Sequence, residues 1–167
     1  AERVGLDRLN RYARDFGLAE RTGIGINSEA RGFLASRTWY EEHYGRFRLG
    51  YTLNTAIGQG NTRVTLLQLA LAYAALANGG VLYAPQLIER IETPDGAIVE
   101  EPEPQVRRRL GVDPEHLAFN AESLRGVVND EGGTALGARS EGGVSISGKT
   151  GTAEVAPGSM RSGDARR

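Results

Sequence analysis

Residues 65–80 read TLLQLALAYAALANGG, a nearly continuous apolar run that ends in two glycines. Apolar side chains occupy nearly every position from Leu66 to Ala77, which is typical of a helix that is buried on all sides. Thr65 can cap the start of this helix, because a Thr hydroxyl accepts hydrogen bonds from N–H groups of the first turn. The Asn-Gly-Gly run can end it. We therefore predict a helix in the middle of a domain.

The sequence before this helix predicts a mostly helical part over residues 1–80. Apolar residues at helical spacing predict one helix over Val4–Phe16, and a short second helix is expected over Thr38–Tyr44. Glycines and small residues predict a loop with short extended pieces over 21–36. Residues 55–60 contain two glycines and indicate a tight backbone passage.

Extended segments and a loop are predicted for residues 81–112. Residues 81–99 favour strands, with a turn at the Thr-Pro-Asp-Gly run of 93–96. The charged, proline-containing stretch 100–109 predicts an exposed loop.

Residues 113–167 predict one helix, one strand and a tail. Asp113-Pro114 favours a helix start, since proline is tolerated at the first helical position. This helix should end near Val128, within a segment 113–140 that has room for one more helical turn after its Gly-Gly pair. Loose alternation predicts a strand over 144–156, followed by a polar tail over 157–167. Because the chain lacks an initial Met and ends in that tail, we expect a fragment: a single partial domain over residues 1–167.

Composition excludes several classes of function. The chain has no cysteine, which excludes disulfides, thiolate metal sites and a cysteine nucleophile. The formal net charge of −1 gives no general attraction to nucleic acid or to an anionic membrane. The run Arg107-Arg108-Arg109 is interpreted as a solvated face, because it is too short and isolated for nucleic-acid binding. No apolar run is long enough to span a bilayer.

The candidate binding and catalytic residues lie in the segment Ser147-Gly148-Lys149-Thr150-Gly151-Thr152. Its small residues, Gly148 among them, leave room for an extended peptide to add along the strand edge. Lys149, the only lysine, can place a positive charge beside a carboxylate or a developing oxyanion. Thr150 and Thr152 can offer hydroxyls to that carboxylate, and Gly151 leaves space for an acyl group. A surface strand with a solvated lysine explains the same residues, so the segment alone leaves both interpretations open.

Lys-Thr-Gly resembles the third signature of penicillin-binding proteins and serine β-lactamases, which follows Ser-x-x-Lys and Ser-x-Asn. The resemblance to class B transpeptidases covers nearly the whole chain, from Ala1 to Val155, in the family's order. It rests on these stretches: Gly17-Leu18, Thr22-Gly23-Ile24, Gly32-Phe33-Leu34, Tyr51–Gly60, Val64–Ala70, Asn78-Gly79-Gly80, Val127-Val128-Asn129 and Gly132–Ala135. The forms of Gly58-Gln59-Gly60 and Thr152–Val155 look more like the elongation type than the septal type.

Two family signatures are not in this sequence. Ser-x-x-Lys needs a Ser three residues before a Lys, and the residue three before Lys149 is Ile146. Ser-x-Asn does not occur either. In the family both signatures lie upstream of the part that this chain resembles, and a further strand follows Lys-Thr-Gly. The resemblance therefore implies that the fragment is inactive alone.

The resemblance implies an α+β fold, with an antiparallel sheet packed on helices, present here in part. It implies a serine-type D-Ala-D-Ala transpeptidase that cross-links peptidoglycan and binds penicillin. Lys149, Thr150 and Gly151 would belong to the catalytic set and Thr152 and Gly148 to the substrate-binding set, with no metal or other cofactor. Stem peptides, β-lactams and a membrane glycosyltransferase of the elongation machinery would be partners, and nucleic acid would not. The expected location is the cell envelope, on the periplasmic face of the inner membrane, through an N-terminal helix absent from this chain.

Three alternatives share the same resemblance. A penicillin-sensing receptor domain would acylate without turnover, and a signalling segment in its gene would identify it. A β-lactamase would turn over β-lactams, although the long apolar helix and residues 127–135 fit that class less well. A non-catalytic interaction module would lack Ser-x-x-Lys in the whole gene.

Overall fold

The computed structural model describes residues 1–140 and 142–151. The helices are α1 (Leu6–Asp15), α2 (Arg37–Tyr44), α3 (Leu49–Ala56), α4 (Leu66–Ala77), α5 (Pro114–Asn129) and a short 3₁₀ turn, η1 (Leu136–Ala138). The strands are β1 (Phe33–Leu34), β2 (Thr62–Arg63), β3 (Val81–Tyr83), β4 (Ile91–Glu92), β5 (Ile98–Glu100) and β6 (Val106–Arg109).

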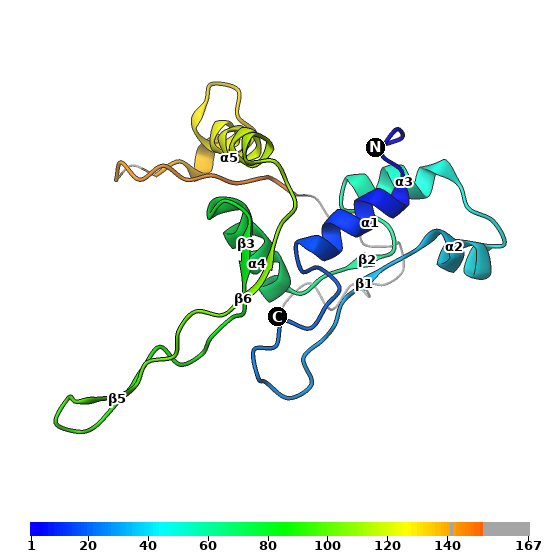
Figure 1. Ribbon diagram of the computed structural model, residues 1–167. Coiled ribbons are helices and arrows are strands. Elements are labelled where there is room, and N and C mark those ends of the chain that lie inside the picture. The colour runs from blue at the N-terminus through cyan, green and yellow to red at the C-terminus, as the bar shows by residue number, and fades with distance from the viewer. Residues whose placement is uncertain (141, 152–167) are drawn as a thin grey trace, which may run out of the picture.

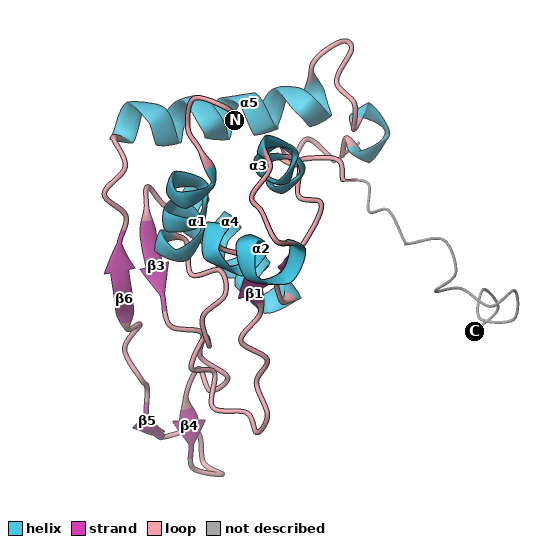
Figure 2. Ribbon diagram, turned by 90° about the vertical axis from the view of Figure 1, so that its right-hand side faces the viewer, coloured by secondary structure: helices cyan, strands magenta, loops and turns pink. Residues whose placement is uncertain are grey.

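The architecture is α+β, with α4 at its centre. Figure 1 shows α1, α2 and α3 on one side of α4 and α5 on the other, while the β4–β5 hairpin projects from the body as an arm. The turned view in Figure 2 shows α5 across one end of the molecule, with the hairpin at the opposite end. The strands form three separate two-stranded antiparallel ladders, β1–β2, β3–β6 and β4–β5.

The predicted central helix is confirmed at both ends. Thr65 and Gln68 form a capping box, in which each side chain accepts a hydrogen bond from the other residue's backbone N–H. At the other end the Gly80 N–H donates to the Ala75 carbonyl oxygen at 2.7 Å, while Gly79 has a φ of +80°. This left-handed glycine directs the chain from α4 into β3.

In the part of the chain that the structure describes, buried apolar side chains form two small clusters. One joins Leu6 of α1 to Ala35 and Tyr40, with surrounding aromatic side chains. The other joins Ala75 of α4 to Leu82 of β3 and Leu110 after β6. Part of α4 stays uncovered: the side chain of Leu66 is 87% exposed. The prediction of burial on all sides is therefore wrong for this flank, because β3 and α5, which contact α4 most, cover only part of its circumference.

Most of the other helices match their predictions, whereas several other segments differ from theirs. Residues 49–56 form α3, a helix that the sequence analysis did not predict, directly before the two-glycine passage. Residues 100–109 are not simply an exposed loop, since β6 pairs with β3 there. Charged residues can occupy such a strand because its backbone, not its side chains, makes the ladder bonds.

The arginine run of β6 also differs from its prediction as a solvated face. Arg108 donates hydrogen bonds to the carbonyl oxygens of Arg14 and Asp15 at the end of α1, and it pairs with Glu20 at 3.2 Å. Arg107 donates to the Arg21 carbonyl oxygen at 3.1 Å. The free carbonyls of a helix C-terminus attract cations, which explains the contact of Arg108 with the end of α1.

Of the strand predicted over 144–156, the structure describes residues 144–151. These residues pair with none of the strands in the described part of the chain. Residues 144–151 lie beside α5 and are not a strand, because a helix offers only isolated carbonyl acceptors and not the regular row of donors and acceptors that a ladder needs. None of the helices within residues 1–140 and 142–151 has the length and apolar character needed to cross a membrane.

Candidate functional site

The Lys-Thr-Gly segment, drawn in orange in Figure 1, lies beside α5. The Gly148 N–H donates to the Leu124 carbonyl oxygen at 3.0 Å. The Asn129 side-chain amide donates to the Ile146 carbonyl oxygen at 2.7 Å and to Arg125 of its own helix at 2.7 Å. These bonds attach the segment to the last turns of α5.

Lys149 and Thr150 are exposed and interact with each other. The Lys149 ammonium Nζ donates to the Thr150 carbonyl oxygen at 2.8 Å and to its hydroxyl Oγ1 at 3.2 Å. The Thr150 hydroxyl also lies 3.2 Å from the hydroxyl of Thr134, and either can donate in that pair. One positive charge and two hydroxyls therefore lie together on an accessible surface, an arrangement that can bind a carboxylate.

The predicted glycines differ in their surroundings. Among the described residues, no heavy atom lies within 4 Å of the position that a Cβ at Gly151 would take. A Cβ at Gly148 would approach the Val128 side chain at 3.5 Å, so this glycine packs toward α5. Thr152 lies outside the described residues.

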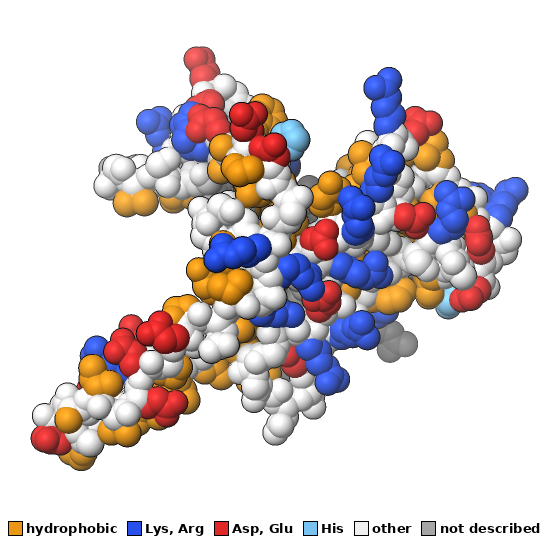
Figure 3. Space-filling view, in the orientation of Figure 1, with side chains coloured by type: hydrophobic (Ala, Val, Ile, Leu, Met, Phe, Trp, Pro, Cys, Tyr) orange, Lys and Arg blue, Asp and Glu red, His pale blue; other side chains and the backbone are white. Residues whose placement is uncertain are grey.

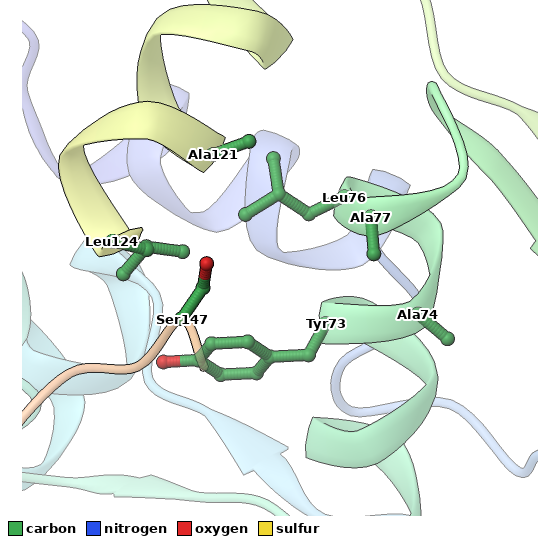
Figure 4. Close-up of a pocket in the computed structure, with 7 residues that line it drawn as sticks. All are labelled: Tyr73, Ala74, Leu76, Ala77, Ala121, Leu124 and Ser147. Carbon is green, nitrogen blue, oxygen red and sulfur yellow. The ribbon is translucent and has the colours of Figure 1, made fainter. Parts of the chain in front are cut away.

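A cavity of about 510 Å³ opens beside Ser147, between α4 and α5. Figure 4 shows Tyr73 and Leu76 of α4 and Leu124 of α5 directed toward Ser147. The lining residues are Tyr73, Ala74, Leu76, Ala77, Ala121, Leu124 and Ser147. The Lys-Thr-Gly segment therefore borders a mostly apolar hollow.

Two residues of this site, Thr134 and Asn129, carry no local pattern that predicts a role in it. The sequence placed Thr134 only within the Gly132–Ala135 stretch of the resemblance, yet its hydroxyl lies 3.2 Å from that of Thr150. Asn129 entered only through the resemblance, and its amide bonds the segment itself. The only sequence signal was their position at a helix end before Lys-Thr-Gly. No group of three or more His, Asp or Glu side chains within residues 1–140 and 142–151 is arranged to hold a metal ion.

Comparison with known proteins assigns this chain and its fold to one class of protein. The family model for the penicillin binding protein transpeptidase domain matches residues 1–166. The chain therefore belongs to the penicillin-binding protein transpeptidase family.

Its relatives include two proteins named for peptidoglycan or penicillin. The peptidoglycan D,D-transpeptidase MrdA of Haemophilus influenzae is 34% identical over 93% of this chain. The penicillin-binding protein PbpB of Mycolicibacterium smegmatis is 36% identical over 92% of it. The chain spans 24% and 23% of these two proteins, about a quarter of their length.

Solved structures agree in fold. The chain of a structure titled "Structural coordination of polymerization and crosslinking by a peptidoglycan synthase complex" matches 92% of this chain with a TM-score of 0.72 and 36% identity. A complex between PBP2 and MreC from Helicobacter pylori gives a TM-score of 0.74 at 25% identity, again over 92% of this chain. This chain covers 24% and 27% of those two chains.

Proposed function

We propose that the protein to which this chain belongs is a peptidoglycan D,D-transpeptidase of the elongation type that binds penicillin. The family and the transpeptidase name of a close relative support the activity. The main support for the proposed role of this chain is the exposed Lys149 ammonium. It donates a hydrogen bond to the Thr150 hydroxyl, and the next residue, Gly151, leaves space beside this pair.

In the proposed reaction, a serine outside this chain attacks the carbonyl carbon of the penultimate D-Ala of a stem peptide. The C–N bond breaks, the terminal D-Ala leaves as an amine that takes up a proton, and an acyl-serine remains. An amine of a neighbouring stem peptide then attacks the acyl carbon and releases the serine. β-Lactams acylate the same serine.

In this scheme Lys149, Thr150 and Thr152 bind the stem peptide and polarise its reacting carbonyl group. None of them is the nucleophile. The ammonium and the hydroxyls hold the terminal carboxylate of the stem peptide, while Gly151 leaves space for its acyl part. Gly148 supports this set through its backbone bond to α5.

The proposed partners are stem peptides, β-lactams and a membrane glycosyltransferase of the elongation machinery. The proposed location is the periplasmic face of the inner membrane, through an anchor outside this chain. The titles that name a peptidoglycan synthase complex and a PBP2–MreC complex support a place in a larger assembly.

Acylation of the whole protein by a fluorescent penicillin tests this function. We expect covalent labelling of the whole protein and none of the isolated chain, which contains no Ser-x-x-Lys. Lys149→Ala should slow acylation by roughly 100- to 1,000-fold, the usual loss for an oxyanion-stabilising group. Arg109→Ala, on exposed β6, is the matched cationic control and should acylate like the wild type.

Each result decides between functions. Unchanged acylation of Lys149→Ala would refute its assigned role. Absence of labelling in the whole protein would favour a non-catalytic module, and rapid turnover of the β-lactam would favour a β-lactamase.

A further inference from the structure

The contacts of the Lys-Thr-Gly segment with α5 fall on alternate residues. Ile146, Gly148 and Thr150 each bond to α5 or to the turn that follows it. Lys149 therefore lies between two attached neighbours, and its ammonium bonds to the oxygens of one of them, Thr150. The position of the Thr150 hydroxyl consequently affects the position of the only lysine charge.

Thr134 is itself held in place by the backbone on both sides. The Gly133 N–H donates to the Asp130 carbonyl oxygen at 2.9 Å, and the Ala135 N–H donates to the Val127 carbonyl oxygen at 3.0 Å. A Cβ at position 133 would lie only 2.5 Å from the Val127 oxygen, so this close turn requires glycine. The Thr134 hydroxyl is thus presented to Thr150 from a fixed turn.

The hydrogen-bond capacity of Thr150 gives this contact a direction. A hydroxyl has one proton to donate and two positions for accepting hydrogen bonds. The Lys149 ammonium can only donate, so it uses one accepting position of the Thr150 Oγ1. If Thr134 donates into the second position, the proton of Thr150 remains for an external acceptor. If Thr150 donates to Thr134 instead, no proton remains for a ligand.

We propose that Thr134 is a positioning residue that donates its hydroxyl proton to Thr150 and so directs the Thr150 proton toward the substrate carboxylate. This inference rests on the proposed function of the same site. It assigns Thr134 an effect on carboxylate recognition that acts through Thr150 and not by contact with the ligand. Asn129 assists by fixing the backbone of the segment at Ile146.

The test measures the acylation rate of the whole protein with benzylpenicillin and with its methyl ester, which lacks the carboxylate. Thr134→Val should slow acylation by benzylpenicillin about three- to ten-fold, the usual range for one hydrogen bond. The methyl ester should react with the variant and the wild type at the same rate. Thr134→Ser keeps the hydroxyl and should restore the reaction with benzylpenicillin.

Additional variants separate positioning from folding. Thr134→Ala removes the hydroxyl without a branched side chain and should reproduce the result of Thr134→Val. Thr38→Val, at an exposed position of α2, is the matched control and should leave both rates unchanged. In a double-mutant cycle, Thr134→Val should add little to Thr150→Val, because both remove the same interaction.

The outcomes are distinct for the two proposals. A wild-type protein that no penicillin acylates would overturn the proposed function. An acylated wild type with equal losses for benzylpenicillin and the ester in Thr134→Val, or with no loss at all, would overturn the role of Thr134 alone. Additive effects in the double-mutant cycle would overturn it as well.

Discussion

At the scale of single residues, Gln68 connects α4 to the loop before β1. Its side chain is 1% exposed and uses its full hydrogen-bonding capacity. The amide oxygen accepts from the N–H groups of Ala19 and Thr65, and the amide nitrogen donates to the carbonyl oxygens of Glu20 and Arg31. A capping residue therefore also positions a loop far away in sequence.

Replacing Gln68 with Leu should lower the free energy of unfolding by about 3 kcal/mol, because buried backbone groups lose their partners. Thermal unfolding of the whole protein measures the change. Gln86→Leu is the control, since Gln86 is exposed and its amide donates to the Glu103 carbonyl oxygen on the surface, and it should change the stability by less than about 0.5 kcal/mol. Equal stability of the two variants would contradict this role of Gln68.

Glu29 closes the loop of residues 22–29 through hydrogen bonds to its carboxylate. The adjacent Thr22, together with the N–H groups of Thr22 and Gly23 that donate to the carboxylate, lowers the pKa of Glu29 below its ordinary value of 4.5. A carboxyl with a lower pKa in the folded state contributes stability above its unfolded pKa. That contribution is lost as the pH falls through the folded pKa.

We therefore expect Glu29→Gln to be less stable than the wild type at pH 7, with a difference that shrinks as the pH falls below about 4.5. Unfolding curves of both proteins between pH 7 and pH 3 measure it. A difference that stays constant over this range would show that the Glu29 charge does not stabilise the loop.

At the scale of elements, Arg108 attaches β6 to the end of α1. Its guanidinium binds two C-terminal carbonyls of the helix and the Glu20 carboxylate, although 37% of the side chain remains exposed. A planar fork of donors suits such a set of acceptors, and a lysine could not reproduce it. The ladder of β3 and β6 is thereby connected to the helices on the far side of α4.

Arg108→Met should destabilise the whole protein by about 1 to 2 kcal/mol, since it removes bonds of a cation to a helix C-terminus. Arg109→Met, one residue further on the same strand, should have little effect because its side chain is exposed. Chemical denaturation at low and high salt measures both. The loss in Arg108→Met should be smaller at high salt, and an equal loss in the two variants would exclude this attachment.

At the scale of the whole molecule, much apolar surface lies outside the two clusters. Leu66 of α4 and Phe119 of α5 are 87% and 72% exposed. Figure 3 shows further apolar side chains along the projecting arm, where Leu87, Ile98 and Val99 are exposed. Within residues 1–140 and 142–151, the two-stranded ladders also leave strand edges without partners. Exposed surface of this kind favours association.

The isolated chain of 167 residues should therefore self-associate as its concentration rises, as light scattering after size-exclusion chromatography would measure. Leu66→Gln should reduce association, because it removes apolar surface that is already exposed. Leu82→Gln, at a 1% exposed position, should instead unfold the chain. A monomer that unfolds cooperatively would contradict the expected association.

The local pattern of the sequence determined the elements whose signals are local. Thr65 and the Asn-Gly-Gly run delimit α4 because capping depends on residues within one turn. Asp113-Pro114 predicts the start of α5 for the same reason. Family membership also followed from the sequence, since the order of several short stretches is specific where one tripeptide is not.

Contacts between distant residues were decided only by the tertiary structure. The arginines of β6 bind carbonyl oxygens more than 80 residues away, and no local pattern distinguishes them from a solvated face. Thr134 and Thr150 are 16 residues apart, and their hydroxyls meet because the chain after α5 folds back along the helix. The sequence determines which groups a side chain can bind. Its actual hydrogen-bond partner depends on how the helices and loops pack.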